Sequence, residues 1–490
     1  MVRGFRSLLL LSLVLAGAVM AAAEQPTSAT PPTVELRLRP ILSPYGKGDI
    51  DGAIAAARKL IEDNVDDADA LSWLGFLLLR NNQPAEALAS LGRARELRPN
   101  DLEVLNNYGL ALMGSGKSEE AIGHFEELHK KSPTMVQPLY NLGAIHLGKK
   151  DWKAAEQAYR TAIELAPRDA YIRNNLGAAL EGQGLMARAA EQYQRASELM
   201  PSVAVFAQNA GVAWLRADQA ARAVPWLRRA LKLEPGSIEL ALALVEAYRK
   251  ENEPRLALDV VDESLKANEN SSLLWFTAGV LRHDLGNVPG ALIAFQKATK
   301  LDPDDIDSWS NLGLLQFSQG QFAEAAVSFD RAAGLNPNSV DARLNLAAAL
   351  ARSGDLQRAV AAWREVLALV PGKNSVRILL ADGLWALGEK EEARKEYDWA
   401  VKAEPTNARA QNGFGLTLFD EGRFELAAAR FREAIRLEPK LLAAHNNLAA
   451  ALEKLGRREE AIRVLQNVLK LAPDFEDARN NLRRLQEEGS

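Results

Sequence analysis

A period of 34 residues runs through almost the whole chain and leaves few folds open to it. Alanine recurs at every step of that period from Ala53 to Ala461. Proline recurs in the same way from Pro99 to Pro473, and Glu269 occupies the one step that lacks it. A fixed period of this length is typical of repeat proteins, in which each small unit stacks on its neighbours. The period therefore predicts one elongated array instead of the several globular domains that 490 residues would otherwise suggest.

Residues 306–339 show what a single repeat encodes. Two apolar stripes of helical spacing, separated by the polar stretch 318–321, predict a pair of helices. The second helix ends at a proline, which has no N–H to donate and whose ring clashes with the preceding turn. The residues that form this pattern are, in order, Trp309, Leu312, Gly313, Ala325, Phe329, Ala332 and Pro337. The position of Gly313 is glycine or alanine in every repeat except one, which has Val245, and such small residues predict a close approach of two helices.

The order Trp, Leu-Gly, Ala, Phe, Ala, Pro over 34 residues resembles the tetratricopeptide repeat. This resemblance implies an all-α fold, an α-solenoid in which helix-turn-helix repeats form a right-handed superhelix. We expect twelve full repeats within residues 68–475. Residues 49–67 match only a second helix and are expected to form an N-terminal capping half-repeat, and residues 476–490 a C-terminal capping helix.

Two stretches depart from the periodic pattern. Residues 24–48 contain five prolines and no sustained periodicity, which predicts a flexible linker. Pro40 and Pro44 fall where the first helix of the capping half-repeat would run. The sixth repeat has Val245, Ser264 and Glu269 at positions that are elsewhere small, apolar or proline. We expect a weak interface there and a hinge near residues 245–272.

The first 23 residues resemble a secretory signal peptide. Arg3 and Arg6 precede an uncharged run from Ser7 to Ala23, which ends in three alanines that suit a small-x-small cleavage site. The run is shorter than the roughly 20 apolar residues that cross a bilayer. We therefore expect a periplasmic or secreted protein, with a retained membrane anchor as the alternative. Because the chain has no cysteine, we expect no lipoprotein anchor and no disulfide framework.

Charge and motif content predict neither nucleic-acid binding nor catalysis. The chain has 59 Lys and Arg against 64 Asp and Glu, interspersed, whereas nucleic-acid binding needs a concentrated basic surface. His124 and His129 are five residues apart, which turns them to different faces of one helix and argues against a metal site. The stretch 111–118 loosely matches a phosphate-binding loop, but the pattern before it is helical and no strand is predicted. We expect no catalytic residue, metal or cofactor.

An asparagine precedes the Leu-Gly position in many repeats and is the candidate peptide-binding residue. These asparagines are Asn107, Asn141, Asn175, Asn209, Asn311, Asn345, Asn447 and Asn481. In families of this repeat the first helices line the concave face, so the resemblance implies that these side chains are exposed in a groove. Each amide offers two donors and an acceptor, so a ladder of them could pair with the backbone of an extended peptide. The alternative is that the asparagines bond neighbouring helices or water.

The asparagine pattern is similar to the ladder in the repeat domain of O-linked N-acetylglucosamine transferases. Those enzymes carry a separate catalytic domain, whereas residues 476–490 here predict only a cap, so we do not expect their activity. Apolar and aromatic side chains are expected near the asparagines, where they would add contact area. They are Phe76, Leu79, Leu110, Met113, Tyr140, Leu147, Leu215, Phe276, Phe317, Trp385 and Phe419. No repeat has a cation at the asparagine position, which argues against a clamp for a peptide carboxyl terminus.

The function that these patterns favour is that of a non-enzymatic scaffold. We expect it to bind another protein, as an extended peptide or partner segment in the concave groove, and to bind no nucleic acid or small-molecule cofactor. The alternative is a structural module for envelope assembly or self-association that uses the convex face or the ends.

Overall fold

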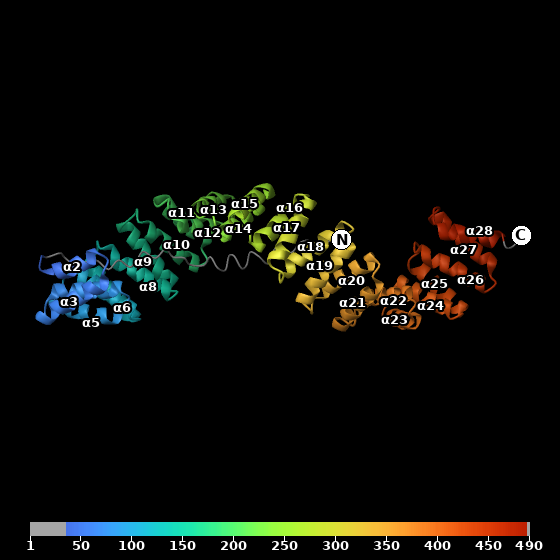
Figure 1. The fold of residues 1–490 in the computed structure, drawn as a ribbon, viewed down its shortest axis with the longest axis horizontal. Coiled ribbons are helices and arrows are strands. Elements are labelled where there is room, and N and C mark those ends of the chain that lie inside the picture. The colour runs from blue at the N-terminus through green and yellow to red at the C-terminus, as the bar shows by residue number, and fades with distance from the viewer. Residues whose placement is uncertain (1–35, 488–490) are drawn as a thin grey trace. The chain divides into compact units, whose positions relative to one another are not determined.

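The computed structural model describes residues 36–487 of the chain. Within this range the fold is all-α, as predicted: a short 3-10 helix, η1 (Leu36–Leu38), is followed by 27 α-helices, α2 to α28, and there is no strand (Figure 1). The expected signal peptide, residues 1–23, and the first part of the expected linker, residues 24–35, lie outside the described residues. No helix between residues 36 and 487 has both the length and the apolar character needed to cross a membrane.

The chain divides into two compact units, and the division falls between Asn270 and Ser271, at the exit of the sixth repeat. Unit 1 contains α2 (Arg39–Gly46), α3 (Ile50–Asp63), α4 (Ala68–Arg80), α5 (Pro84–Leu97), α6 (Leu102–Gly114), α7 (Ser118–Lys131), α8 (Val136–Gly148), α9 (Trp152–Leu165), α10 (Ala170–Gly182), α11 (Met186–Leu199), α12 (Ala204–Arg216), α13 (Ala220–Leu233), α14 (Ile238–Lys250) and α15 (Pro254–Ala267).

Unit 2 begins with α16. Its helices are α16 (Ser272–Asp284), α17 (Val288–Leu301), α18 (Ile306–Ser318), α19 (Phe322–Leu335), α20 (Val340–Ser353), α21 (Leu356–Leu369), α22 (Asn374–Ala386), α23 (Lys390–Ala403), α24 (Ala408–Asp420), α25 (Phe424–Leu437), α26 (Leu442–Lys454), α27 (Arg458–Leu471) and α28 (Glu476–Glu487). In both units each 34-residue step holds one first helix and one second helix.

Local sequence explains where these helices begin and end. Asp305 begins α18, because its carboxylate accepts hydrogen bonds from the backbone N–H groups of Asp307 and Ser308. The turn between the helices of a pair needs a residue with positive φ, which is Gly320 after α18 and Gly116 after α6. Gly116 lies in the stretch that loosely matches a phosphate-binding loop, and the element before it is the helix α6.

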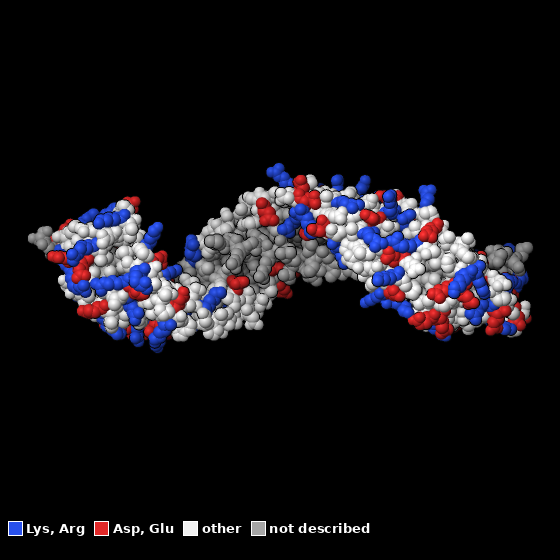
Figure 2. Space-filling model, turned by 180° about the vertical axis from the view of Figure 1, so that it is seen from behind, with Lys and Arg blue, Asp and Glu red and all other residues white. Residues whose placement is uncertain are grey.

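Within each unit, every helix packs on the next, and successive first helices also contact one another. Such contacts join α4 to α6 and α6 to α8 in unit 1, and α22 to α24 and α24 to α26 in unit 2. We call the surface formed by the first helices the inner face. The spaces between successive second helices are the outer grooves. Figure 2 shows that positive and negative side chains are interspersed on the visible surface, as the composition predicts.

The small residue at the eighth position of a repeat makes room for a large side chain of the second helix, which is an aromatic ring in most repeats. A Cβ atom built on Gly109 would lie 2.5 Å from the ring of Phe125, and one on Gly313 would lie 2.8 Å from that of Phe329. The predicted close approach of the two helices is therefore confirmed. In the sixth repeat the larger Val245 coincides with Val261 at the ring position, and both are buried, at 4% and 0% exposure. A valine pair in place of a glycine and a ring keeps the total side-chain volume similar. Val245 therefore fits this hairpin, although we expected it to weaken the packing.

The prediction of a flexible linker over residues 24–48 is wrong in its second half, because residues 39–46 form the helix α2. Pro40 lies in the first turn of this helix, where a missing N–H group costs nothing. Leu38 and Ile41 are fully buried in one cluster with Trp73 of α4. Helices α2 and α3 therefore form a complete helix pair instead of the expected half-repeat. Leu38 and Ile41, which lie on either side of Pro40, contribute to the core of this pair.

Candidate binding surfaces: the inner face and the outer grooves

The structure places the eight predicted asparagines on first helices and on the terminal helix α28. Asn107, Asn141 and Asn175 are only 1%, 4% and 4% exposed, which corrects the expectation that they face an open groove. A ligand on the surface cannot reach these three amides. The other five are partly exposed, namely Asn209, Asn311, Asn345, Asn447 and Asn481.

Several of the asparagines, buried or partly exposed, bond the preceding repeat. Each of four asparagines donates through Nδ2 to the Oδ1 atom of an asparagine 35 residues earlier, and we call these pairs amide rungs. The rungs are Asn141 to Asn106 at 3.4 Å, Asn209 to Asn174 at 2.9 Å, Asn447 to Asn412 at 3.0 Å and Asn481 to Asn446 at 2.8 Å. Asn175 similarly donates to the hydroxyl of Tyr140, at 3.1 Å. These bonds between neighbouring helices match the alternative given above for the asparagines.

The acceptors of the rungs were missed by sequence reasoning, although a signal for them is present. Asparagine doublets occur at residues 106–107, 174–175, 446–447 and 480–481, and the first member of three of these doublets accepts a rung. A primary amide that gives one N–H to a rung keeps a second N–H and its oxygen. Asn447 and Asn481, which each give one N–H to a rung, are partly exposed.

The predicted apolar groove residues fall into two classes. Five of them belong to the core, with exposures between 1% and 8%: Phe76, Leu110, Tyr140, Leu215 and Phe276. The other six are partly exposed, and all of them occupy the twelfth position of the repeat, in the last turn of a first helix. They are Leu79, Met113 and Leu147 in unit 1 and Phe317, Trp385 and Phe419 in unit 2. We call these six residues the anchor row.

The anchor row of unit 2 is held in place by the first residue of the following helix. The rings of Phe317 and Phe322 meet edge to face at 5.1 Å between centroids, and those of Phe419 and Phe424 at 5.2 Å. The ammonium group of Lys390 lies 5.4 Å from the ring centroid of Trp385. Each anchor is therefore supported on one side, which lowers the entropy that it would lose on binding.

Two carboxyl groups on the first helices of unit 2 are partly removed from water. Burial raises the pKa of Asp307, and the negative charge of Asp305 adds to this effect. Burial also raises the pKa of Asp382. Two contacts act in the opposite direction and lower it, namely a hydrogen bond from the Tyr397 hydroxyl at 2.5 Å and an ion pair with Arg409 at 3.1 Å. Both carboxylates would be stabilised by a further cation at the inner face.

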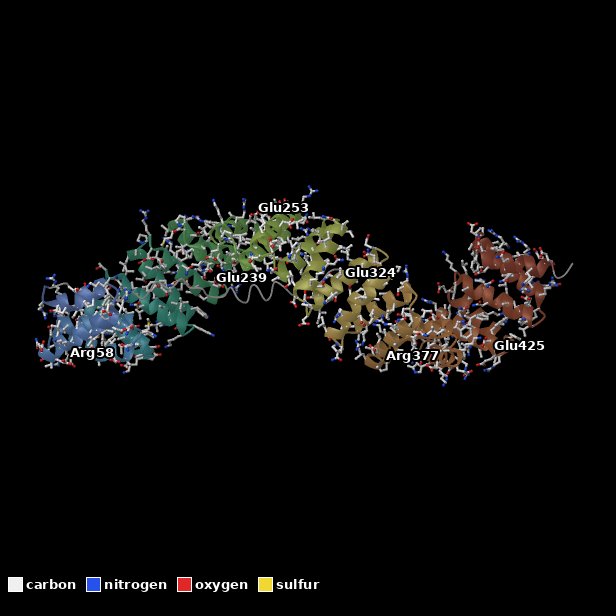
Figure 3. The ribbon with its side chains drawn as sticks, viewed as in Figure 1. Arg58, Glu239, Glu253, Glu324, Arg377 and Glu425 are labelled. Atoms are coloured by element: carbon white, nitrogen blue, oxygen red, sulfur yellow. The ribbon has the colours of Figure 1, made fainter. Side chains whose placement is uncertain are left out.

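A second recurrent contact spans six of the junctions between repeats. The fourth residue of a first helix reaches back to the carbonyl oxygen of the proline six residues earlier, and we call this bond the proline staple. It joins Arg173 to Pro167 at 2.7 Å, Trp309 to Pro303 at 2.8 Å, Arg377 to Pro371 at 3.1 Å, Gln411 to Pro405 at 2.8 Å, His445 to Pro439 at 3.0 Å and Arg479 to Pro473 at 2.6 Å. Arg377, which is labelled in Figure 3, lies on α22 and also forms an ion pair with Glu396 at 2.5 Å.

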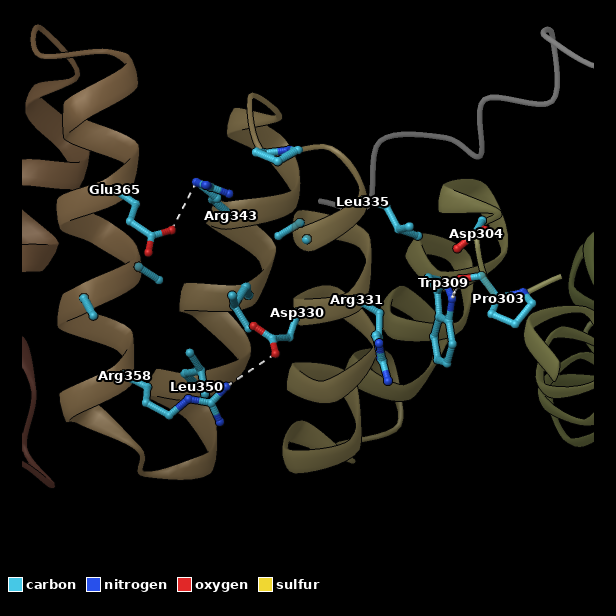
Figure 4. A pocket seen from close by; sticks show the side chains of 16 residues that line it. Pro303, Asp304, Trp309, Asp330, Arg331, Leu335, Arg343, Leu350, Arg358 and Glu365 are labelled. Carbon is cyan, nitrogen blue, oxygen red and sulfur yellow. Dashed lines mark hydrogen bonds and ion pairs between the residues drawn. The ribbon is translucent and has the colours of Figure 1, made fainter.

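Three outer grooves open at junctions where the fourth residue makes no such bond. That residue is Leu105 in unit 1 beside a cavity of about 310 Å³, Ala241 in unit 1 beside one of about 720 Å³, and Arg343 in unit 2 beside one of about 640 Å³. In the last of these, Arg343 points instead to Glu365 at 3.2 Å, and Arg358 points to Asp330 at 3.7 Å (Figure 4).

The part of the chain that the structure describes contains no group of three His, Asp or Glu side chains arranged to hold a metal ion.

Four family models match parts of the chain. The C-terminal domain of cilia and flagella-associated protein 70 matches residues 202–414, and subunit 3 of the anaphase-promoting complex, or cyclosome, matches residues 46–128. Two tetratricopeptide-repeat models match residues 140–204 and 418–485. No curated protein matches the chain.

Several solved structures are similar to parts or most of the chain. The APC/C hetero-tetramer Cut9-Hcn1 is 13% identical, with 92% of this chain and 96% of that chain covered and a TM-score of 0.33. MamA 41-end from Desulfovibrio magneticus RS-1 is 28% identical over 35% of this chain and 98% of its own, with a TM-score of 0.33. YrrB, described as a TPR protein with an unusual peptide-binding site, is 26% identical over 38% of this chain and 97% of its own, with a TM-score of 0.33. On the 34-residue helical pairs and the matching repeat models, the chain belongs to the tetratricopeptide-repeat family.

Proposed function

We propose that the chain is a non-enzymatic scaffold that holds an extended segment of a partner protein on its inner face. As a tetratricopeptide-repeat protein it is a protein-protein interaction scaffold. The proposal adds which surface binds and what form the partner takes. The observation that carries it is the anchor row, because six apolar side chains at one repeat position stay partly exposed, whereas Leu215 at the same position is buried.

The inner face of unit 2 offers what an extended segment needs. Phe317, Trp385 and Phe419 supply apolar contact area for side chains of the segment. An extended backbone also exposes N–H and C=O groups that must find partners when water is displaced. The remaining N–H and oxygen of the amides at Asn447 and Asn481 can pair with such groups without reading the side chains of the segment.

The carboxyl groups of Asp307 and Asp382 favour a segment that carries Lys or Arg near its apolar residues. Their raised pKa values record an incomplete hydration of the charged form. A cation from the partner would offset that loss, so binding should lower both pKa values and release protons near the raised values. Interspersed acidic and basic side chains elsewhere on the surface leave the overall attraction weak and the recognition local.

A random dodecapeptide phage library selected on the full chain tests this proposal. Enriched peptides should combine spaced apolar residues with Lys or Arg. A triple variant, Phe317→Ala with Trp385→Ala and Phe419→Ala, should weaken them roughly 100-fold, at ~1 kcal/mol for each lost anchor. The matched control replaces three exposed apolar residues of second helices in the same unit, Ile293→Ala, Val327→Ala and Leu426→Ala. Equal losses in the two triple variants, or no loss in either, would contradict an inner-face site.

We also propose that the first 23 residues direct export of the chain. The support is the sequence pattern of Arg3, Arg6 and the uncharged run from Ser7 to Ala23. Mass spectrometry of the amino terminus after cell fractionation tests it. An exported protein that begins at or near Glu24 is the expected result. An intact terminus in the membrane fraction would favour a retained anchor, and an intact terminus in the cytosol would overturn export.

A further inference from the structure

We infer that the outer groove between α13 and α15 is a second docking site, separate from the inner face. Its occupant is an amphipathic α-helix of a partner protein, with an apolar stripe bordered by acidic residues on one side and basic residues on the other. The groove lies wholly within unit 1.

The floor of this groove is apolar and open. Leu244 and Tyr248 of α14 lie at its base, between Leu231 of α13 and Leu256 and Val260 of α15. Leu256 is 42% exposed, and the cavity has a volume of about 720 Å³. Ala241 occupies the fourth position of α14 and is too short to form the proline staple that closes other junctions. An apolar strip of this kind is a surface that a complementary apolar stripe can cover.

The two walls of the groove carry opposite charges. Arg228 and Lys232 line the α13 side, whereas Asp259, Glu263 and Lys266 line the α15 side and leave it with a net negative charge. Glu263 is paired with Lys266 one turn further along the same helix, at 2.5 Å, in an exposed contact that contributes little stability. A partner with acidic residues along one border and basic residues along the other would therefore meet opposite charge on both walls.

The chemistry of the lining favours a helix over an extended strand. Both walls are helices whose backbone groups are bonded internally, and no Asn or Gln side chain lines the groove. An extended segment pressed into this apolar strip would leave backbone N–H and C=O groups without partners, which is costly. A helix bonds its own backbone and can bury an apolar stripe at i, i+3, i+4 and i+7. The inner face differs from this groove, because its asparagine amides can pair with the backbone of an extended segment.

Three synthetic helical peptides with the same leucine stripe test the inference by fluorescence anisotropy with the full chain. One carries Glu along one border and Lys along the other, one carries Glu on both borders, and one carries Lys on both. Exchanging the two borders would be no control, because a helix that binds in the reverse direction restores the same match. The mixed peptide should bind at least about 10-fold tighter than either single-sign peptide, since each of these faces one like-charged wall.

A charge reversal makes the test specific to this groove. Asp259→Lys with Glu263→Lys gives two basic walls, so the preference should switch to the peptide with Glu on both borders. The matched control, Glu324→Lys with Glu425→Lys, makes the same change in net charge on second helices of unit 2, where Figure 3 shows both residues. It should keep the preference for the mixed peptide.

Several results would overturn the inference. They are no binding of the mixed peptide to the unchanged chain, no switch in the reversed variant, or a switch in the control as well. Self-association of the chain in light scattering that the charge reversal abolishes would show that a second copy occupies the groove. The triple variant of the anchor row should bind the mixed peptide normally, so failure here and failure of the inner-face proposal can be told apart.

Discussion

In several hairpins a glycine faces a ring sixteen residues later and leaves no room for a Cβ atom. The ring of Phe125 is fully buried, so it cannot move away from a side chain added at Gly109. The period alone predicts a small residue at this position, because two helices must approach there. It does not show how little room is left, which depends on the angle at which the two helices cross.

We predict that Gly109→Ala weakens its hairpin by about 1–3 kcal/mol, because the new Cβ would lie 2.5 Å from the Phe125 ring. Gly123, on the second helix of the same hairpin, has nothing within 4 Å of such a Cβ. Gly123→Ala should therefore stabilise the hairpin by about 0.5–1 kcal/mol through lower backbone entropy in the unfolded chain. Native-state hydrogen exchange of α6 and α7 measures both changes. Shifts in the same direction would contradict this account of Gly109.

The amide rungs are the second feature at the residue scale. Asn174 is completely buried, and its Oδ1 atom accepts from Asn209. The sequence predicts a row of amides but not its partners, because the pairing depends on the register between successive first helices. The asparagine doublets were the available signal, and they become meaningful only once the 35-residue spacing of the bonds is known.

We predict that Asn209→Ala costs about 1–3 kcal/mol, because it removes the rung donor from the buried Asn174 oxygen. Asn345→Ala serves as the control, since Asn345 is partly exposed and the residue 35 positions earlier is Ser310. Its cost should stay below about 0.5 kcal/mol. Hydrogen exchange of α10 and α12, and of α18 and α20, gives the two values. A larger loss at Asn345 would remove the structural role assigned to the rungs.

At the scale of the element, the helical hairpins were predictable and α2 was not. Two apolar stripes in each 34-residue step predict a helix pair wherever proline falls only at the junction. Pro40 and Pro44 argue against a helix over residues 39–46, although burial of Leu38 and Ile41 favours one. The proline staples were equally hidden, because Trp, Arg, Gln and His share no pattern except the ability to donate a hydrogen bond.

The partly buried carboxyl group of Asp382 on α22 should make stability depend on pH in a defined direction. Burial raises the pKa of Asp382 in the folded chain, so its contribution to stability is greatest below the ordinary aspartate pKa of about 3.9. That contribution is lost as the pH rises from there through the raised value. The free energy of unfolding of Asp382→Asn, taken relative to that of the unchanged chain, should therefore be higher at pH 7 than at pH 4. The reason is that the amide carries no charge to desolvate. Urea titrations at the two pH values measure this difference, and equal differences would contradict the assigned burial effect.

At the scale of the whole molecule, the chain divides at the place where the sequence pattern is poorest. The boundary between Asn270 and Ser271 follows the repeat that has Ser264 and Glu269 at positions usually held by apolar residues and proline. Because the stability of a repeat array is a sum of repeat and neighbour terms, a poor repeat lowers the local free energy of opening. The sequence could indicate this location but not which surface a partner uses, since a few side chains decide that on an unchanged scaffold.

We predict that residues 254–270 exchange their amide hydrogens faster than residues 306–339 in the full chain. The exit of the sixth repeat is polar and lacks the proline that ends other second helices. Residues 306–339, with the complete pattern, provide the internal reference. Equal protection of the two stretches would mean that the sixth repeat is no weaker than the others and that no hinge lies there.

The most direct test of the inner face as the holding surface is a hydrogen-exchange footprint of a library-selected peptide on the full chain. Protection should appear on the first helices α18, α22 and α24, which carry Phe317, Trp385 and Phe419, and should disappear in the triple alanine variant. Protection confined to the second helices α19, α23 and α25 would contradict the proposed function.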